Sequence, residues 1–414
     1  MQANSNPRIF LSAGEASGDH YGAGILAELR ARLPEASFSG LGGAEMAAAG
    51  LERIVRAEDV AHMGFTEVVR HLPYIYAQYR KLVASIKSAR PDVAVLIDFP
   101  EVNFRLARQL KRLGVPVLWF VSPQLWAWKR KRLRLVQQLV DRMMVIFPFE
   151  AAFYRNRSVV AEFVGHPLAA LPLPIVTREE YAAKYRLDPI KQWIALLPGS
   201  RQSEIEKNLP EMLQAAADLS QQIDCEFLLP VASTIAHGWL RRNFAIRERA
   251  EDRRSAADRG NTALPRIVTV DDARTALFHA RASVVASGTA TVQSLTIGNP
   301  FVVVYRVSAL TFALAKRLIR YPAEIPAETD ADGHLPIAMV NLIAGKRIVP
   351  ELINRRFTAA SLAAALRPLL DETQARAQMI ADLAEARAKL MIAPAESPLR
   401  RVSDAVVELL DGSL

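Results

Sequence analysis

Short apolar runs recur along the chain, and longer helical patterns separate them. The runs are rich in Val, Ile, Leu and Phe, which is typical of strands buried on both faces of a parallel sheet. The series breaks once and then resumes, which predicts an α/β fold of two Rossmann-like domains facing a cleft. The predicted strands are Ile9–Ala13, Val93–Ile97, Val115–Val121, Met143–Phe147, Trp193–Leu197, Phe227–Val231, Ile267–Val270, Ser283–Ala286 and Phe301–Tyr305.

The break is a proline-rich stretch over 167–177, whose last residue, Thr177, stands in capping-box spacing with Glu180. We therefore predict an N-terminal domain over 1–170 and a second domain over 171–370. An alanine-rich helical pattern continues beyond it, so residues 371–414 are predicted to be C-terminal helices. They either pack back on the N-terminal domain or exchange with a second chain, which would make a homodimer.

Composition narrows the class of protein. The chain has 414 residues, a formal net charge of +9 and one cysteine, Cys225, which excludes an internal disulfide. It shows neither a signal-peptide pattern nor the ~18 uninterrupted apolar residues of a spanning helix. We therefore expect a cytoplasmic protein. The charge implies an anionic partner, and the lack of zinc-finger or RNA-binding patterns argues against nucleic acid.

Loops at the ends of predicted strands carry the candidate chemistry, because open parallel sheets bind ligands there. The loop Ser12–Asp19 is either a phosphate-binding turn or an ordinary tight turn. Leu196–Arg201 offers backbone N–H groups and a guanidinium, and Ala286–Thr291 offers hydroxyls before a helix. Both suit phosphate oxygens. Two such anion cradles in one domain predict a nucleotide diphosphate.

Asp98 ends a predicted strand, where partial burial could raise its pKa into the range of a general base. Capping of the next helix is the interpretation that the residues alone favour. The Asp330–Asp332 pair has a metal-binding spacing but lies in a polar loop, and the histidines lack ligand spacing. We therefore predict neither a metal nor another cofactor, and Arg201 would then stabilise a leaving diphosphate.

Two features could face lipid. Trp126 and Trp128 precede a run of cations, which fits lipid head groups or a sugar phosphate but also a basic helix over a packed tryptophan. An apolar stripe at helical spacing fits either an interfacial helix or the core. The residues predicted to contact membrane or acyl chains are Phe65, Val68, Val69, Leu72, Ile75 and Tyr76.

Taken in order along the chain, the motifs resemble the lipid-A-disaccharide synthase family, and they span nearly the whole chain. The N-terminal motifs are SAGEASGD at Ser12–Asp19, LIDFPEVNFRLA from Leu96, VSPQLWAW at Val121–Trp128, IFPFE at Ile146–Glu150 and FVGHPL at Phe163–Leu168. The C-terminal motifs are LLPGSR, ASGTAT and VNLIAG, the last at Val340–Gly345.

The resemblance implies a GT-B type, metal-independent, inverting glycosyltransferase at the cytoplasmic face of the inner membrane. It would join UDP-2,3-diacylglucosamine to 2,3-diacylglucosamine 1-phosphate, giving a β-1,6-linked disaccharide and UDP. Asp98 matches the essential aspartate and Arg201 a residue needed for activity. The implied nucleotide- or substrate-binding residues are Gly14, Glu15, Ser17, Gly18, Gln124, Trp126, Gly199, Ser200, Arg201, Ser287, Gly288, Thr289, Gln293 and Asn341.

The chain departs from the family pattern twice. Gln293 stands where a glutamate usually grips the ribose, and the stretch 322–336 resembles an insertion. Three rival functions stay open on the residues alone. They are a transferase adding GlcNAc to a lipid-linked muramyl peptide, a UDP-GlcNAc 2-epimerase, and a basic protein that binds membranes or nucleic acid without catalysis.

Overall fold

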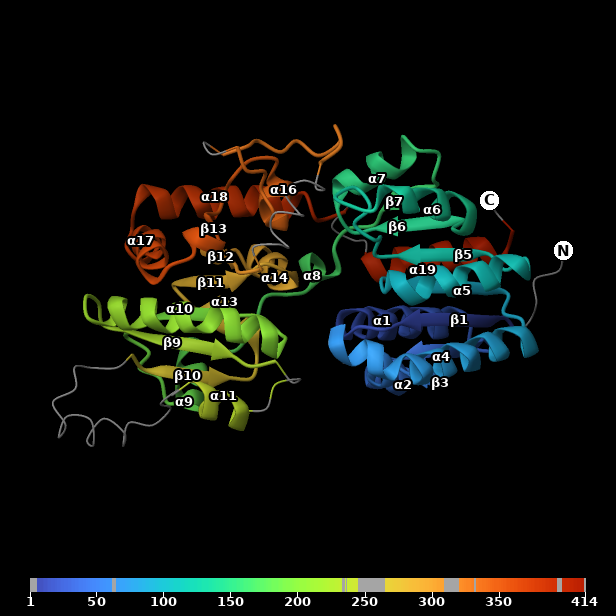
Figure 1. Cartoon of the computed structure of the whole chain (residues 1–414), viewed down its shortest axis with the longest axis horizontal. Coiled ribbons are helices and arrows are strands. Elements are labelled where there is room, and N and C mark those ends of the chain that lie inside the picture. Colours follow the sequence, from blue (N-terminus) through green and yellow to red (C-terminus); the bar gives the residue numbers. More distant parts are fainter. Residues whose placement is uncertain are drawn as a thin grey trace. The chain divides into compact units, whose positions relative to one another are not determined.

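The computed structural model describes residues 6–61, 65–232, 235, 237–244, 265–308, 320–330, 333–392 and 397–412, without the side chains of 61, 65–72, 237 and 241. The chain forms two compact units (Figure 1). Unit 1 comprises Met1–Ala170, Arg320–Glu324 and Leu390–Leu414, and unit 2 comprises Leu171–Ile319 and Ile325–Lys389.

Unit 1 is built on a seven-stranded parallel sheet of order β3-β2-β1-β4-β5-β6-β7. Its strands are β1 Arg8–Ala13, β2 Ser37–Gly42, β3 Glu52–Arg56, β4 Val93–Ile97, β5 Val117–Phe120, β6 Arg142–Val145 and β7 Ala161–Phe163. Its helices are α1 Ala16–Arg32, α2 Ala44–Ala48, α3 Glu58–Ala61, α4 Phe65–Ser88, α5 Pro100–Arg112, η1 Arg130–Arg132, α6 Leu133–Leu139, α7 Pro148–Arg155, α8 Pro167–Ala170 and α19 Pro398–Leu410.

Unit 2 repeats the plan with a six-stranded parallel sheet of order β10-β9-β8-β11-β12-β13. Its strands are β8 Gln192–Leu197, β9 Cys225–Pro230, β10 Ile267–Val270, β11 Ala282–Ala286, β12 Phe301–Tyr305 and β13 Glu351–Ile353. Its helices are α9 Arg178–Tyr185, α10 Gln202–Ser220, α11 His237–Asn243, α13 Ala273–His279, α14 Thr289–Ile297, α16 Met339–Ala344, η2 Asn354–Arg356, α17 Ala359–Leu370 and α18 Gln374–Ala388.

All nine predicted strands are present, and the two Rossmann-like sheets confirm the predicted fold class. Four strands were not predicted, namely β2, β3, β7 and β13. Three of them form sheet edges, where one side is exposed and the apolar run is interrupted, as in Glu52–Arg56. The fourth, β2, contains glycine in place of branched residues. The capping box of α9 is also confirmed, because Thr177 Oγ1 accepts the Glu180 N–H at 3.2 Å.

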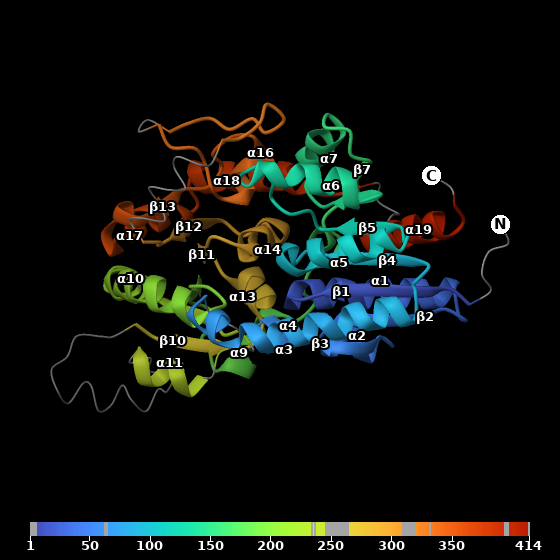
Figure 2. The same ribbon diagram turned by 45° about the vertical axis from the view of Figure 1, so that its right-hand side comes forward.

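The C-terminal helix α19 packs back on unit 1 of the same chain, where it contacts α1, β4 and β5 (Figures 1 and 2). Its buried face includes Val402, Ala405 and Val406. On its polar side Arg401 pairs with Glu162, the Nη2–Oε2 distance being 2.8 Å. The helix α19 thus adopts one of the two alternatives predicted for the C-terminal helices, whereas α18, which was predicted with it, belongs to unit 2.

Candidate active site

Each sheet has one point at which the strand order reverses, and ligands of doubly wound sheets bind beyond it. In unit 1 this point lies between β1 and β4, whose last residues Ala13 and Ile97 are paired. In unit 2 it lies between β8 and β11, which pair through Leu197 and Val285. The four predicted loops follow these four strands. The topology therefore brings them together in two pairs, one in each unit.

Asp98 stands directly after β4 in a strained turn. Asp98 and Phe99 have φ angles of 44° and 48°, a conformation that costs free energy in residues with side chains. The Asp98 N–H donates to the Phe120 carbonyl at 2.9 Å. Buried Asn103 donates from Nδ2 to the Asp98 carbonyl at 2.7 Å and accepts at Oδ1 from the Ser12 hydroxyl, also at 2.7 Å. The turn is thus held from both neighbouring strands.

The first loop supports this turn through a glycine. A Cβ built on Gly14 would lie 2.3 Å from the nearest atom of the Phe99 ring, so only glycine lets the ring pack there. Glu15 is exposed, Ser17 is half-buried and Gly18 is buried. Asp19 accepts from the N–H groups of Gly43, Glu45 and Met46 and so caps α2.

The environment of Asp98 favours its protonated form. Burial, followed by the negative charge of Glu15, raises the pKa of Asp98 to about 6, although a hydrogen bond from the Phe99 N–H partly offsets them. Burial and the charge of Asp98 raise the pKa of nearby Tyr21 to about 12, so this phenol is neutral at physiological pH. A carboxylate with this pKa can accept a proton near neutral pH.

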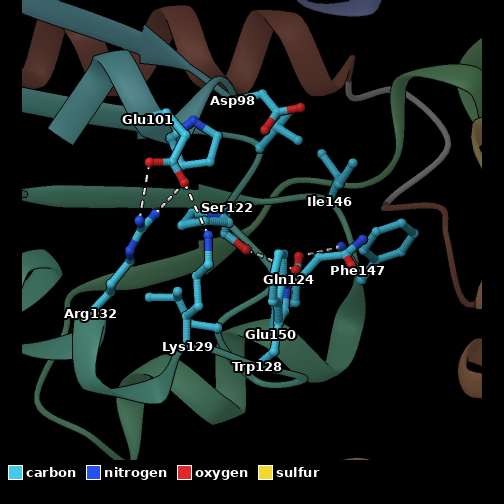
Figure 3. A pocket seen from close by; sticks show the side chains of 14 residues that line it. Asp98, Glu101, Ser122, Gln124, Trp128, Lys129, Arg132, Ile146, Phe147 and Glu150 are labelled. Atoms are coloured by element: carbon cyan, nitrogen blue, oxygen red, sulfur yellow. Dashed lines mark hydrogen bonds and ion pairs between the residues drawn. The ribbon is translucent and has the colours of Figure 1, made fainter. Parts of the chain in front are cut away.

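A pocket of about 260 Å³ opens beside Asp98 within unit 1 (Figure 3). Strained backbone gathers around it, because Val121 (φ 61°) and Lys129 (φ 53°) line it together with Asp98. Such strain persists where the surrounding structure enforces it, often at functional sites. The lining residues are Asp98, Pro100, Glu101, Val121, Ser122, Pro123, Gln124, Leu125, Trp128, Lys129, Arg132, Ile146, Phe147 and Glu150.

Buried Glu150, which was not among the predicted site residues, anchors one wall of the pocket. Its carboxylate accepts from Ser122 Oγ at 2.8 Å, from Trp126 Nε1 at 3.0 Å and from the Phe147 N–H at 3.2 Å. Burial raises the pKa of Glu150 to about 7. This carboxyl group joins the VSPQLWAW loop to the IFPFE loop. Both motifs carried the resemblance, which is the signal that could have indicated the residue.

The same network separates the two tryptophans of the loop. Trp126 is 2 % exposed and packs edge-on against Phe149, so it belongs to the core and not to the pocket surface. Trp128 is half exposed and lines the pocket, as does exposed Gln124. The predicted site residue Trp126 therefore supports the wall, whereas Trp128 can contact a ligand.

A second polar group stands at the other side of the pocket. Glu101 accepts from Arg132 through both oxygens, at 2.8 and 3.1 Å, and from Lys129 Nζ at 3.1 Å (Figure 3). Hydrogen bonds from Arg132 and Lys129 lower the pKa of Glu101 to about 2. All three side chains were outside the predicted site. The EVNF and WKRKR segments contained them without showing that they meet.

The two predicted anion cradles of unit 2 differ in the structure. Gly288 precedes α14 with a φ of 154°, no atom lies within 4 Å of a Cβ built there, and α14 begins without a side-chain cap. This cradle, which includes Ser287 and Thr289, is open. At the other, Glu204 Oε2 accepts from the Ser200 and Arg201 N–H groups at 3.1 and 3.4 Å.

Glu204 therefore stands where the prediction placed a phosphate. The same carboxylate fills the space beside Gly199, because a Cβ built there would lie 2.6 Å from Glu204. The Arg201 side chain is 71 % exposed, and its closest approach to Glu204 is 3.6 Å. A phosphate would reach this N-terminus of α10 only after Glu204 turned away.

Two further predicted residues lie in unit 2. Buried Asn341 donates to the Val349 carbonyl and to Glu351, and it accepts from the Ile348 and Val349 N–H groups at 2.8 and 3.1 Å. All four of its hydrogen-bonding positions thus hold α16 to the following segment. Gln293 is half-buried on α14, one turn after the open cradle.

The predicted lipid-facing stripe lies on α4. The side chains of Phe65, Val68, Val69 and Leu72 are outside the described part of the structure. Of the remaining two, Ile75 is half-buried and Tyr76 is 61 % exposed. Farther along the helix, Leu82 and Ile86 are in the core. Within the described ranges no helix is both long and apolar enough to span a membrane.

The stretch 322–336 has two anchors. Glu324 accepts from Asn156 and Arg157 of unit 1 at 2.8 and 2.9 Å. Asp330 accepts from Arg356 of unit 2 at 2.8 Å, while Asp332 is outside the described residues. Among the residues that the structure describes, no three His, Cys, Asp or Glu side chains gather as a metal site would require.

Two parallel sheets that share one strand order over six strands, each with polar loops at its switch point, define the GT-B type of fold, which solved glycosyltransferases share. UGT71G1 of Medicago truncatula, solved with UDP-glucose, shares this fold with a TM-score of 0.60 and 11% identity, covering 99% of this chain and 100% of that one. A candidate UDP-N-acetylglucosamine 2-epimerase from Listeria monocytogenes is similar at a TM-score of 0.58 and 8% identity, covering 99% and 96%. The fold alone thus covers transferases and epimerases.

The sequence comparisons distinguish them. The family model for lipid-A-disaccharide synthetase matches residues 9–397. The lipid-A-disaccharide synthase of Acidobacterium capsulatum is 54% identical over 407 residues, which are 98% of this chain and 97% of that protein. The chain belongs to the lipid-A-disaccharide synthase family and is a glycosyltransferase. The predicted resemblance is confirmed, and the epimerase and muramyl-peptide alternatives are set aside.

Proposed function

We propose that this chain transfers 2,3-diacylglucosamine from UDP to the 6-hydroxyl of 2,3-diacylglucosamine 1-phosphate. The observation that carries the proposal is the family membership together with Asp98, which stands at the pocket of unit 1 with its pKa raised to about 6. Unit 1 supplies the base and takes the acceptor. Unit 2 holds the UDP through its switch-point loops.

In the reaction, the acceptor O6 attacks the anomeric carbon of the donor, and a new C1–O6 bond forms. The bond between C1 and the diphosphate oxygen breaks, so UDP leaves and the configuration inverts. The proton of the 6-hydroxyl passes to the Asp98 carboxylate. The N-terminus of α14 at Ser287–Thr289 and the guanidinium of Arg201 stabilise the departing diphosphate. Gln293 contacts the nucleoside through neutral hydrogen bonds.

Peripheral binding to the cytoplasmic face of the inner membrane completes the proposal. Both substrates carry acyl chains, and α4 presents the exposed tyrosines Tyr74 and Tyr76 near the exposed cations Arg80 and Lys81. The net charge of +9 favours an anionic surface.

The test is a reaction in detergent with both acylated substrates, in which UDP and disaccharide are measured together. Wild-type protein is expected to form them in equal amounts. Asp98→Asn is expected to lower kcat by about 10²- to 10⁴-fold and to leave UDP affinity unchanged, because it removes only the proton acceptor.

Asp92→Asn is the matched control, since Asp92 stands at the other end of β4 and accepts the Arg8 N–H. It is expected to retain activity. Failure to form disaccharide with any acyl length would refute the proposed reaction, and loss of UDP binding in Asp98→Asn would refute the base role.

A further inference from the structure

The cluster of Glu101, Lys129 and Arg132 has no role in the proton transfer, yet it lines the same pocket as Asp98. Glu101 comes from the first turn of α5, two residues after the strained turn, and Arg132 comes from η1. Figure 3 shows both cationic side chains directed at the Glu101 carboxylate. Two cations on one carboxylate leave an excess of positive charge at this side of the pocket.

The geometry of the cluster matches that of an anion site. Arg132 donates through two nitrogens to two oxygens, and Lys129 adds a third donor to one of them. A phosphate monoester presents the same pair of oxygens with more charge, so it can replace the carboxylate on the guanidinium.

The cluster around Glu101 is open to water. The Glu101 side chain is 56 % exposed, and those of Lys129 and Arg132 are 39 % and 29 % exposed. Water screens such accessible ion pairs. The paired guanidinium nitrogens and the Glu101 pKa of about 2 nevertheless make this cluster a strong anion ligand. A phosphate can therefore reach the cluster from solvent and compete with Glu101 for the same donors through its larger charge.

Trp128 adds an aromatic ring to the pocket beside the cluster. It lines the pocket, is half exposed, and has Lys129 Nζ 4.4 Å from its ring centroid. An exposed indole face suits the apolar face of a sugar ring. The pocket thus offers a base, an aromatic face and a pair of cations in one cavity.

We propose that Arg132 and Lys129 bind the 1-phosphate of the acceptor sugar, taking it in exchange for Glu101. This inference rests on the proposed function, in which Asp98 receives the proton of the 6-hydroxyl. C6 and the anomeric phosphate lie on either side of the ring oxygen of one glucosamine unit. An acceptor with its 6-hydroxyl at Asp98 then directs its phosphate along the pocket towards the cluster. These residues would determine specificity for phosphorylated acceptors.

The test compares two acceptors, 2,3-diacylglucosamine 1-phosphate and the corresponding methyl glycoside without phosphate. Wild-type enzyme is expected to prefer the phosphorylated acceptor in kcat/KM. Arg132→Gln is expected to lower kcat/KM for that acceptor by roughly tenfold or more, chiefly through KM, and to leave the methyl glycoside within about twofold. Glu101→Gln is expected to raise kcat/KM for the phosphorylated acceptor, because the competing carboxylate is gone.

Arg134→Gln is the matched control. Arg134 is an exposed arginine of α6 outside the pocket lining, so its replacement removes the same charge from the same region. Equal losses on both acceptors in Arg132→Gln, or an equal loss in Arg134→Gln, would overturn the proposal. If Arg132→Gln does not fold, Arg132→Lys keeps the charge without the bidentate fork and is expected to lose selectivity partially. Unchanged selectivity in Arg132→Lys together with unchanged Glu101→Gln would also overturn it.

Two binding measurements distinguish the acceptor from other ligands that carry phosphate. If the cluster instead binds lipid head groups, Arg132→Gln will weaken binding to anionic vesicles. If it binds the donor, the variant will lose UDP affinity. Either result would overturn the assignment to the acceptor.

Water-soluble glucosamine 1-phosphate tests the anion site by binding affinity alone, without catalysis. Wild-type protein is expected to bind it at least several-fold more tightly than Arg132→Gln. A wild-type protein that binds this probe but forms no disaccharide would refute the reaction while retaining the anion site.

Discussion

At the scale of single residues, the chemistry depends on how far each carboxylate is removed from water. Partial burial raises the pKa of half-buried Asp98 to about 6, and full burial raises that of Glu150 to about 7. Glu101 lies in the same pocket, but its cationic partners lower its pKa to about 2. Three carboxylates in one cavity therefore have three different proton affinities, which separates a base from a wall support and a counter-ion.

The pH dependence of catalysis should report Asp98. Its carboxylate must be ionised to accept the acceptor proton, so kcat/KM is expected to rise with pH and to level off above a pKa near 6. The measurement is the initial rate of disaccharide formation from pH 5 to 8. A flat profile across this range would contradict the base role of Asp98.

The same ionisation has a consequence for stability. Asp98 has its pKa raised from 3.8 to about 6 on folding, so the folded state binds more protons than the unfolded state between these values. Stability is then lost as pH rises from 3.8 through 6. Asp98→Asn removes this ionisation, so it is expected to raise the free energy of unfolding by up to about 3 kcal/mol at pH 8. At pH 4 it is expected to leave that free energy nearly unchanged. Denaturant titrations at both pH values provide the measurement.

Residue identity alone did not distinguish these roles. Asp98 was compatible with a base or a helix cap, and Trp126 was predicted to bind substrate although Trp128 is the tryptophan that lines the pocket. Asn341 was expected in the site, yet its polar atoms are occupied within unit 2. What separates such residues is burial and hydrogen bonding, which depend on partners far away in the chain.

At the scale of elements, the reacting carboxylate is positioned by the ends of β1 and β4 together. Gly14 after β1 receives the ring of Phe99, and Ser12 within β1 supports Asn103, which holds the Asp98 carbonyl. The conformation of the Asp98 turn therefore depends on contacts between the two loops, and neither loop determines it alone.

Gly14→Ala should disturb this contact. Its methyl group would overlap the Phe99 ring at 2.3–2.5 Å, and displacement of the ring would turn Asp98 away from the acceptor. We expect kcat to fall by about one to two orders of magnitude, with UDP affinity retained. Steady-state kinetics with both substrates provide the measurement.

The partner variant Phe99→Leu removes part of the ring and serves as the control. If the overlap is the cause, Gly14→Ala combined with Phe99→Leu is more active than Gly14→Ala alone. Purely additive losses in the double-mutant cycle would show that the two loops are not coupled in this way.

At the scale of the whole molecule, unit 1 is assembled from segments that are far apart in the chain. Unit 1 receives the C-terminal helix α19 and the short segment Arg320–Glu324. In the latter, Tyr321 lies with its ring centroid 5.9 Å from that of Trp126. The wall behind the pocket thus depends on residues nearly two hundred positions later in the chain.

The net charge and the exposed tyrosines of α4 lead to a prediction for the membrane. The protein is expected to bind vesicles that contain anionic lipid, more weakly as salt is raised. Replacing Tyr74 and Tyr76, which are 43% and 61% exposed, by Ser is expected to weaken binding at least about fivefold. Ile190→Ser is the control, since Ile190 is a 93% exposed apolar residue of unit 2. Unchanged binding of the tyrosine variant would exclude this face of α4.

The amino-acid sequence was sufficient to predict the two Rossmann-like sheets, the capping box of α9 and the loops at both switch points. These features depend on apolar periodicity and turn chemistry, which are local. The sequence also placed Asp98 at the end of a strand. The packed structure alone decided that Glu101, Lys129 and Arg132 share a pocket with it, that Glu204 occupies one predicted cradle, and that α19 completes unit 1. These outcomes follow from contacts between distant segments, and no local pattern records which of several polar residues will be buried together.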